Sequence, residues 1–281
     1  MTGVRGWLLA VLLAAALTAT CGCLRSIAQE PTLAPVCGGG EVARGIVSHI
    51  IDGRTFTLDD GREVRLSGVE VPPLPRDPGK TPGGDEAKAA LEALAGGDEV
   101  VLRRADALSD RYGRIVAYAY TERDDDELFV QGELIASGFA RVGNRVGSRA
   151  CAAQLLDRES AARKAKAGLW ADAYFNVLDA GAPTDVLAHQ GRFALVEGMV
   201  VSVRESGSMI YLNFGRRWSE DFTVTIQKRN ERNFTAAGLE VKELAGRRLR
   251  VRGFIEARGV SAGSPWIAAE HPEQIEIADR D

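Results

Sequence analysis

Arginine and acidic side chains occur together in three short stretches of the first half of the chain. These stretches are residues 51–55 (IDGRT), 64–73 (VRLSGVEVPP) and 110–114 (DRYGR). A guanidinium group can bind two oxygen atoms of one phosphate at once. A phosphodiester repels hydroxide, so its hydrolysis needs positive charge at the site, from guanidinium groups or from a metal ion. The chemistry to consider is therefore the binding of an anion, with or without its hydrolysis.

The pattern of residues 42–174 predicts strands and helices that would position these side chains. Asp60-Gly61 lies between two strand-like runs, which is typical of a tight hairpin. Asp85 is expected to cap a helix. Three strands, a helix, two strands and two further helices fit a small closed barrel with helices packed on it. The expected strands are 42–51, 55–58, 63–66, 99–102 and 115–120, and the later helices are 128–137 and 151–168.

Residues 191–281 repeat the same order of elements. Strands are expected at 193–204, 209–214, 222–226, near 248–252 and at 275–277, with a short helix at 229–237 before the fourth. We therefore expect a mainly β protein with helices, built as two tandem OB-type five-stranded barrels. A leader loop (29–41) would precede the first barrel, and a linker (175–190) would join the two.

With a fourth stretch, 159–170 (ESAARKAKAGLW), the three stretches resemble the staphylococcal nuclease (thermonuclease) family in order and separation. The resemblance covers about residues 42–174 and implies a barrel of that type with three helices. It also implies calcium-dependent hydrolysis of DNA and RNA. In that family aspartates hold calcium, a glutamate activates water and two arginines hold the phosphate.

The resemblance places the two phosphate-holding arginines, which act in catalysis, at Arg65 and Arg114. A further pair that contacts phosphate corresponds to Arg111 and Tyr112. The anion-binding half of the family's site is therefore present.

The hydrolytic half departs from the family's pattern. Arg54 stands where a calcium aspartate is expected, and Glu70 stands in place of the second, as a doubtful metal ligand. Val71 replaces a threonine, and Pro73, which cannot accept a proton, replaces the glutamate that activates water. Two tyrosines of the substrate groove fall near Asn144 and Val146. We hypothesise that Arg54 takes the place of the ion, pairs with Glu70 and completes a metal-free pocket for phosphate, with no cofactor; Ca²⁺ would be needed only by an active nuclease.

Each of these arginines also has a purely structural interpretation. Arg65 could form a surface salt bridge with Glu70, Arg114 could close a solvated turn, and Arg54 could be an exposed turn residue. In the second barrel, Arg248, Arg250 and Arg252 alternate and share one face of a strand, which could bind an anion or could be a solvated strand. The three histidines show no spacing typical of a metal site.

The N-terminus resembles a secretory signal. Arg5 is followed by a thirteen-residue apolar run, 7–19, which spans about 20 Å as a helix and is too short to cross a bilayer. Cleavage after Ala28 would remove residues 1–28 as a signal peptide and place the mature protein in the periplasm or outside the cell, with no membrane span. Lipidation at Cys23 and a retained membrane anchor are alternatives. Cys37 and Cys151 would remain, and an oxidising compartment would permit a disulfide between them.

Composition limits the remaining functions. Hydrophobic residues make up 45% and charged residues 26%, which excludes a disordered or polytopic membrane protein. The formal net charge of −4 requires any basic patch to be local. Three classes remain: a nuclease-like protein that binds DNA, RNA or another polyanion without cleaving it, an active secreted phosphodiester hydrolase, and an envelope protein that uses its barrels to bind unknown protein partners.

Overall fold

The computed structural model describes residues 37–74, 83–123, 126–258 and 263–278. These residues belong to one compact unit, Pro35–Asp281. The expected signal segment, Cys23 and most of the expected leader loop lie outside the described residues. Among the described residues, no helix is long and apolar enough to cross a membrane.

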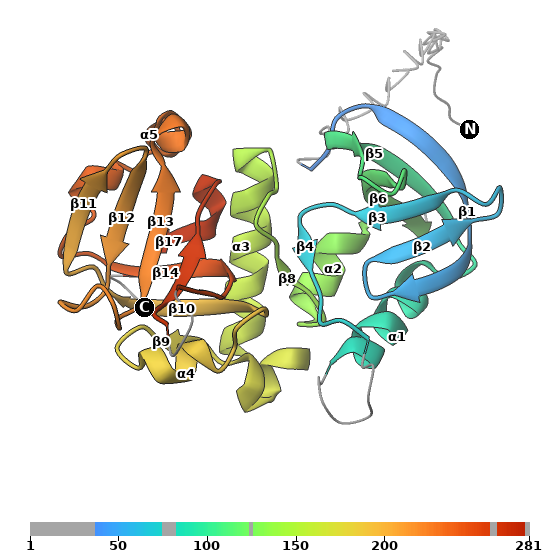
Figure 1. Ribbon diagram of the computed structural model, residues 1–281. Coiled ribbons are helices and arrows are strands. Elements are labelled where there is room, and N and C mark those ends of the chain that lie inside the picture. Colours follow the sequence, from blue (N-terminus) through green and yellow to red (C-terminus); the bar gives the residue numbers. More distant parts are fainter. Residues whose placement is uncertain (1–36, 75–82, 124–125, 259–262, 279–281) are drawn as a thin grey trace, which may run out of the picture. The chain divides into compact units, whose positions relative to one another are not determined.

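The first part of this unit is a sheet that closes on itself (Figure 1). Its strand order is β3-β2-β1-β5-β6-β7, and a parallel pairing between β3 and β6 completes the closure. Short strands β4 and β8 pair beside it. The strands are β1 (Glu41–Asp52), β2 (Thr55–Leu58), β3 (Glu63–Leu66), β4 (Val69–Glu70), β5 (Glu99–Ser109), β6 (Ile115–Arg123), β7 (Asp126–Phe129) and β8 (Arg141–Val142). The helices are α1 (Gly84–Ala95), α2 (Val130–Ala136) and α3 (Arg149–Lys164), followed by short turns η1 (Gly168–Ala171) and η2 (Ala173–Phe175).

Local chemistry explains where these elements begin and turn. The predicted hairpin between β2 and β3 is present, and Gly61 adopts the positive φ of 86° that its tight turn requires. Helix α1 differs from the prediction, because Gly83 is its N-cap and Asp85 lies inside the first turn. There the Asp85 carboxylate interacts favourably with the positive end of the helix dipole and does not cap the backbone.

The second part contains two further sheets, with strand orders β17-β14-β10-β9 and β11-β12-β13-β16-β15. A parallel pairing joins β13 to β16. The strands are β9 (Leu178–Asp179), β10 (Phe193–Met199), β11 (Ser202–Ser206), β12 (Met209–Asn213), β13 (Thr223–Gln227), β14 (Arg248–Phe254), β15 (Glu256–Ala257), β16 (Pro265–Ala268) and β17 (Ile275–Ile277). The helices and turns are α4 (Pro183–Leu187), η3 (Lys228–Asn230), α5 (Glu231–Ala236), η4 (Val241–Glu243) and η5 (Pro272–Gln274).

The expected linker, residues 175–190, is folded. It contains β9, which pairs in parallel with β10, and α4, whose Val186 is fully buried in the second core. The segment predicted as a linker thus carries elements of its own, because the apolar side chains of Leu178 and Val186 pack against the second core.

A disulfide joins Cys37, just before β1, to Cys151 in the first turn of α3, with their Cα atoms 4.8 Å apart. Both residues are buried in the first core. The bridge closes a loop between positions 114 residues apart and encloses most of the first barrel.

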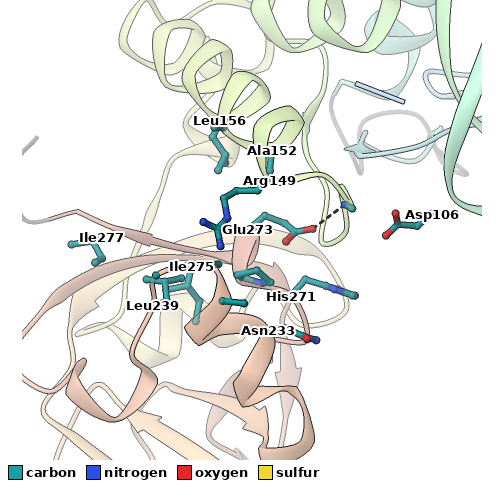
Figure 2. Close-up of a pocket in the computed structure, with 16 residues that line it drawn as sticks. Asp106, Arg149, Ala152, Leu156, Asn233, Leu239, His271, Glu273, Ile275 and Ile277 are labelled. Atoms are coloured by element: carbon teal, nitrogen blue, oxygen red, sulfur yellow. Dashed lines mark hydrogen bonds between the residues drawn. The ribbon is translucent and has the colours of Figure 1, made fainter. Parts of the chain in front are cut away.

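The two parts meet along α3. The carboxylate of Glu273, in η5, accepts hydrogen bonds from the backbone N–H of Val146 at 2.6 Å and of Gly147 at 3.4 Å, directly before α3. Beside this contact lies a cavity of about 750 Å³, with Glu273, His271 and Arg149 at its polar side and Leu156, Leu239 and Ile275 among its apolar residues (Figure 2).

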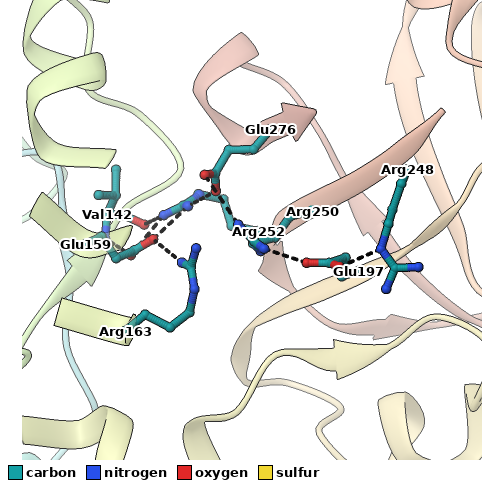
Figure 3. Close-up of polar contacts among 8 residues, drawn as sticks. All are labelled: Val142, Glu159, Arg163, Glu197, Arg248, Arg250, Arg252 and Glu276. Carbon is teal, nitrogen blue, oxygen red and sulfur yellow. Dashed lines mark hydrogen bonds and ion pairs between the residues drawn. The ribbon is translucent and has the colours of Figure 1, made fainter. Parts of the chain in front are cut away.

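A buried ion cluster makes the second contact between the parts (Figure 3). Arg252, on β14, is fully buried and forms an ion pair with Glu159 of α3 at 2.8 Å and another with Glu276 of β17. Glu159 is also fully buried and accepts a hydrogen bond of 2.7 Å from the backbone N–H of Val142. Arg163, one turn further along α3, lies 3.8 Å from the same carboxylate.

This cluster corrects the interpretation of Arg248, Arg250 and Arg252 as an open face for anions. Arg250 is only 7% exposed and pairs with Glu197 at 2.6 Å, while Arg252 is enclosed between the two parts. Arg248 is the exposed member and also pairs with Glu197, at 2.7 Å. The three arginines do share one face of β14, but carboxylates of the protein already neutralise their positive charges.

We predict that Arg252→Met destabilises the protein by about 3–5 kcal/mol, because it leaves the buried Glu159 without its cation. Urea unfolding followed by circular dichroism measures this loss. Arg248→Met is the matched control on the same strand and should cost at most about 1 kcal/mol, since its pair is exposed. Adding Glu159→Gln to Arg252→Met should recover part of the loss, and equal effects of the two single variants would contradict the prediction.

We predict that Cys37→Ala/Cys151→Ala lowers the free energy of unfolding by about 4 kcal/mol, because the open chain regains the entropy of a long loop. Urea unfolding with and without a reductant tests this. The reductant should destabilise the wild-type protein and leave the double variant unchanged.

Candidate anion-binding site

Four chain segments of the first barrel bring the arginines and acids of the sequence motifs together. Arg54 lies in the turn between β1 and β2, Arg65 on β3, Glu70 on β4 and Arg114 just before β6. Because β3 pairs with β2 on one side and with β6 on the other, Arg65 occupies the centre of this group. A backbone hydrogen bond of 2.8 Å from Leu66 to the carbonyl of Arg54 fixes the turn against β3.

These segments surround a cavity of about 250 Å³. Its charged lining consists of Arg54, Arg65, Glu70, Asp106, Asp110 and Arg145. Asn144 and Val146, near which the resemblance places two groove tyrosines, also line it. The carbonyl-type oxygen of the Asn144 side chain, Oδ1, is buried without a hydrogen-bond partner.

Each carboxylate that lines the cavity is paired with an arginine. Glu70 forms an ion pair with Nη1 of Arg54, and both side chains are only about one-sixth exposed, at 15% and 16%. Asp110 accepts from Nε of Arg114 at 2.7 Å and from its Nη2 at 2.6 Å. Asp106 pairs with Arg145 at 3.2 Å. Arg54 is therefore not the exposed turn residue of the structural interpretation.

Arg65 is the cation of this cavity that forms no ion pair or side-chain hydrogen bond within the described part of the chain. The surface salt bridge to Glu70 considered for it is not formed, since Glu70 pairs with Arg54. Burial lowers the pKa of Arg65, and the positive charges of Arg54 and Arg114 lower it further, while Glu70 and Asp52 act in the opposite direction. With three arginine–carboxylate pairs around it, Arg65 supplies a positive charge that no ion pair within the described residues neutralises.

Arg111 and Tyr112 lie at the exposed edge of the same turn. The Tyr112 ring is held between two guanidinium groups, with Cζ of Arg111 4.7 Å and Cζ of Arg114 5.1 Å from its centroid. Tyr112 is 67% exposed, and its hydroxyl accepts a hydrogen bond of 2.6 Å from Arg111. This arrangement presents the cation of Arg111 and the ring of Tyr112 to solvent beside the turn, while Arg114 is 18% exposed and paired with Asp110.

The positions linked to hydrolysis offer little for a metal or a base. Val71 and Pro73 carry no side-chain oxygen, and the carboxylate of Glu70 already forms an ion pair with Arg54. Within the described ranges, no three His, Cys, Asp or Glu side chains lie together as a metal site. The residues present here therefore do not fit a calcium ion held in the way the family holds it.

Two buried charged residues near this site were missed by the sequence reasoning. Arg141, on β8, is the backbone partner of Glu70 in the β4–β8 pairing and is only 5% exposed. Glu159 was read as part of a helix motif, but it binds Arg252 of the second part. A signal for Arg141 existed, since it lies between the apolar residues Phe139, Ala140 and Val142.

The closed strand order of the first part, with helices packed against it, defines a barrel of the OB type. Residues 63–172 match the family model of the staphylococcal nuclease homologues, so this part of the chain is a domain of that family and the predicted resemblance is confirmed. The match indicates a nuclease-like or nucleic-acid-binding function. No curated protein matches the chain.

We predict that Ca²⁺ does not change the melting temperature of the wild-type protein and raises that of Arg54→Asp. The substitution would leave two carboxylates, at positions 54 and 70, where an ion pair now lies, and hard oxygen ligands favour Ca²⁺. Arg62→Asp is the matched control, because it also places a new acid beside an existing one, Asp60, but on the exposed surface. A Ca²⁺ response of the wild-type protein that equals that of Arg54→Asp would contradict this.

Proposed function

We propose that this protein binds a phosphodiester, in DNA, RNA or another polyanion, at the cavity around Arg65, with hydrolysis lost or very weak. The observation that carries the proposal is the charge arrangement. Three carboxylates around the cavity are neutralised by their own arginines, while Arg65 is half-buried with no counter-ion among the described residues. An anionic ligand would supply the missing charge.

The loss of hydrolysis follows from what replaces the catalytic groups. Losing a general base typically slows a reaction by about 10²–10⁴-fold, and Pro73 cannot act as one. Losing the metal removes several kcal/mol more of transition-state stabilisation. The ion pair between Arg54 and Glu70 supports this proposal, since it uses the remaining acid of the site.

We also propose that the second part is an OB-type barrel and that the protein acts outside the cytoplasm. The chain passes from one sheet of the second part to the other twice, from β10 into β11 and from β14 into β15, after very short connections. Strand β13 pairs in parallel with β16. This is the order in which an OB barrel closes. A disulfide between Cys37 and Cys151 is a bond typical of oxidising compartments, which supports the extracytoplasmic location.

We predict that Arg65→Ala weakens binding of a fluorescein-labelled single-stranded oligonucleotide by roughly tenfold or more, the effect expected from removing a charge-assisted hydrogen bond. The slope of log affinity against log salt should also fall by about one. Fluorescence anisotropy at two salt concentrations, in EDTA and in Ca²⁺, measures both quantities. Arg62→Ala, an exposed arginine of the same barrel, is the control.

The same samples separate the alternatives. Release of acid-soluble nucleotides that needs Ca²⁺ and is abolished by Arg114→Ala would establish an active nuclease and overturn the proposal. Absence of oligonucleotide binding at both salt concentrations would instead favour a protein-interaction role. Binding that EDTA does not affect, and that Arg65→Ala weakens, is the result we expect.

A further inference from the structure

Arg141 is a buried cation without a counter-ion in the described part of the chain. It is 5% exposed, and its Nε atom is buried with no hydrogen-bond partner. Its Cζ lies 4.9 Å from the ring centroid of Phe193 and 5.4 Å from that of Phe175. These rings pack against the guanidinium group but offer no lone pair in its plane for the N–H donors.

The two carboxylates whose charges act most strongly on Arg141 are both engaged elsewhere. Glu70 is paired with Arg54, and Glu159 is paired with Arg252 and lies near Arg163. Burial lowers the pKa of Arg141 to about 10, Arg252 also lowers it, and Glu70 and Glu159 raise it. The side chain therefore remains charged at neutral pH, and the charge is only incompletely balanced.

Arg141 lines a cavity of about 500 Å³, which is within the range of small-molecule sites. Glu70 lines both this cavity and the cavity around Arg65. Its walls come from residues 70–73 of the first barrel and from the segments before and at the start of β10. Among the described residues, its lining includes Glu70, Pro72, Arg141, Tyr174, Arg192 and Phe193.

We propose that this cavity is a second anion site, in which Arg141 binds a phosphate group. The planar guanidinium fork of Arg141 matches two phosphate oxygens. Arg192 brings a second guanidinium to the same cavity, where it donates a hydrogen bond to the hydroxyl of Tyr174. Two arginines in one cavity suit a group that can carry two negative charges, such as a phosphate monoester, better than a single carboxylate.

The phosphate has two possible sources. It belongs either to a free phosphorylated small molecule or to a nucleic acid that also contacts Arg65, and the second source rests on the proposed function. The site itself does not rest on it, because Arg141 is buried and unpaired whether or not Arg65 binds a nucleic acid.

Arg141→Met tests the site, because methionine keeps most of the buried volume and removes the charge. Inorganic phosphate should raise the melting temperature of the wild-type protein, and its affinity should fall by roughly tenfold or more in the variant. Without phosphate, Arg141→Met should melt no lower than wild type, because it removes an uncompensated buried charge. A merely structural cation–π role predicts the reverse: a lower melting temperature and an unchanged response to phosphate.

Arg103→Met is the matched control. Arg103 also lies over an aromatic ring, that of Tyr120 at 5.1 Å, but it is paired with Glu127. Its loss should leave the phosphate response unchanged. If Arg141→Met does not fold, Arg141→Lys replaces it, since lysine keeps the charge without the fork and should weaken phosphate binding several-fold. Unchanged affinity in the variant that folds would overturn the proposal.

Arg65→Ala separates this proposal from the proposed function. Phosphate binding that persists in Arg65→Ala and disappears in Arg141→Met supports the second site, whatever the oligonucleotide assay shows. The opposite pattern overturns it. A 5′-phosphorylated single-stranded oligonucleotide then identifies the source: weaker binding by Arg141→Met points to a nucleic acid, and an effect confined to inorganic phosphate and a mononucleotide points to a free phosphorylated molecule.

Discussion

The ion pair between Arg252 and Glu159 decides which buried charges are balanced where the two parts of the chain meet. Both side chains are fully buried, and the pair joins β14 of the second part to α3 of the first. Because Arg252 engages Glu159, that carboxylate does not bind the nearby Arg141. A contact between two parts of the chain therefore engages a carboxylate that lies near Arg141, which has no ion pair among the described residues.

The same principle operates around Glu70. Arg54 engages the Glu70 carboxylate, and within the described residues neither Arg65 nor Arg141 forms an ion pair with it. A single glutamate thus lines both cavities, and its charge is paired with Arg54. Under the proposed function, guanidinium groups would hold an anion in place of a dication, and the site would lack the water that a bound metal activates.

Local sequence chemistry was sufficient for β1, β2, β3, β6, part of β5 and the hairpin at Gly61, because these depend on alternation and turn residues. It did not predict β4, β7 or β8. It was insufficient at Arg250 and Arg252. Alternation shows that these side chains share a face, but it does not show that α3, about ninety residues earlier, supplies an acid to cover that face. The folded segment at 175–190 and the isolation of Arg141 were missed for the same reason, since each depends on contacts between residues distant in sequence.

The burial of Glu159 also limits how this protein could be rearranged during evolution. The family-matched domain ends near residue 172, yet the cation that neutralises its buried glutamate is supplied from position 252. A chain that lost or exchanged the C-terminal half would leave this buried carboxylate without its cation unless Glu159 were replaced or another arginine were provided at the same place. Recombination at this boundary would consequently be tolerated only when both residues changed together.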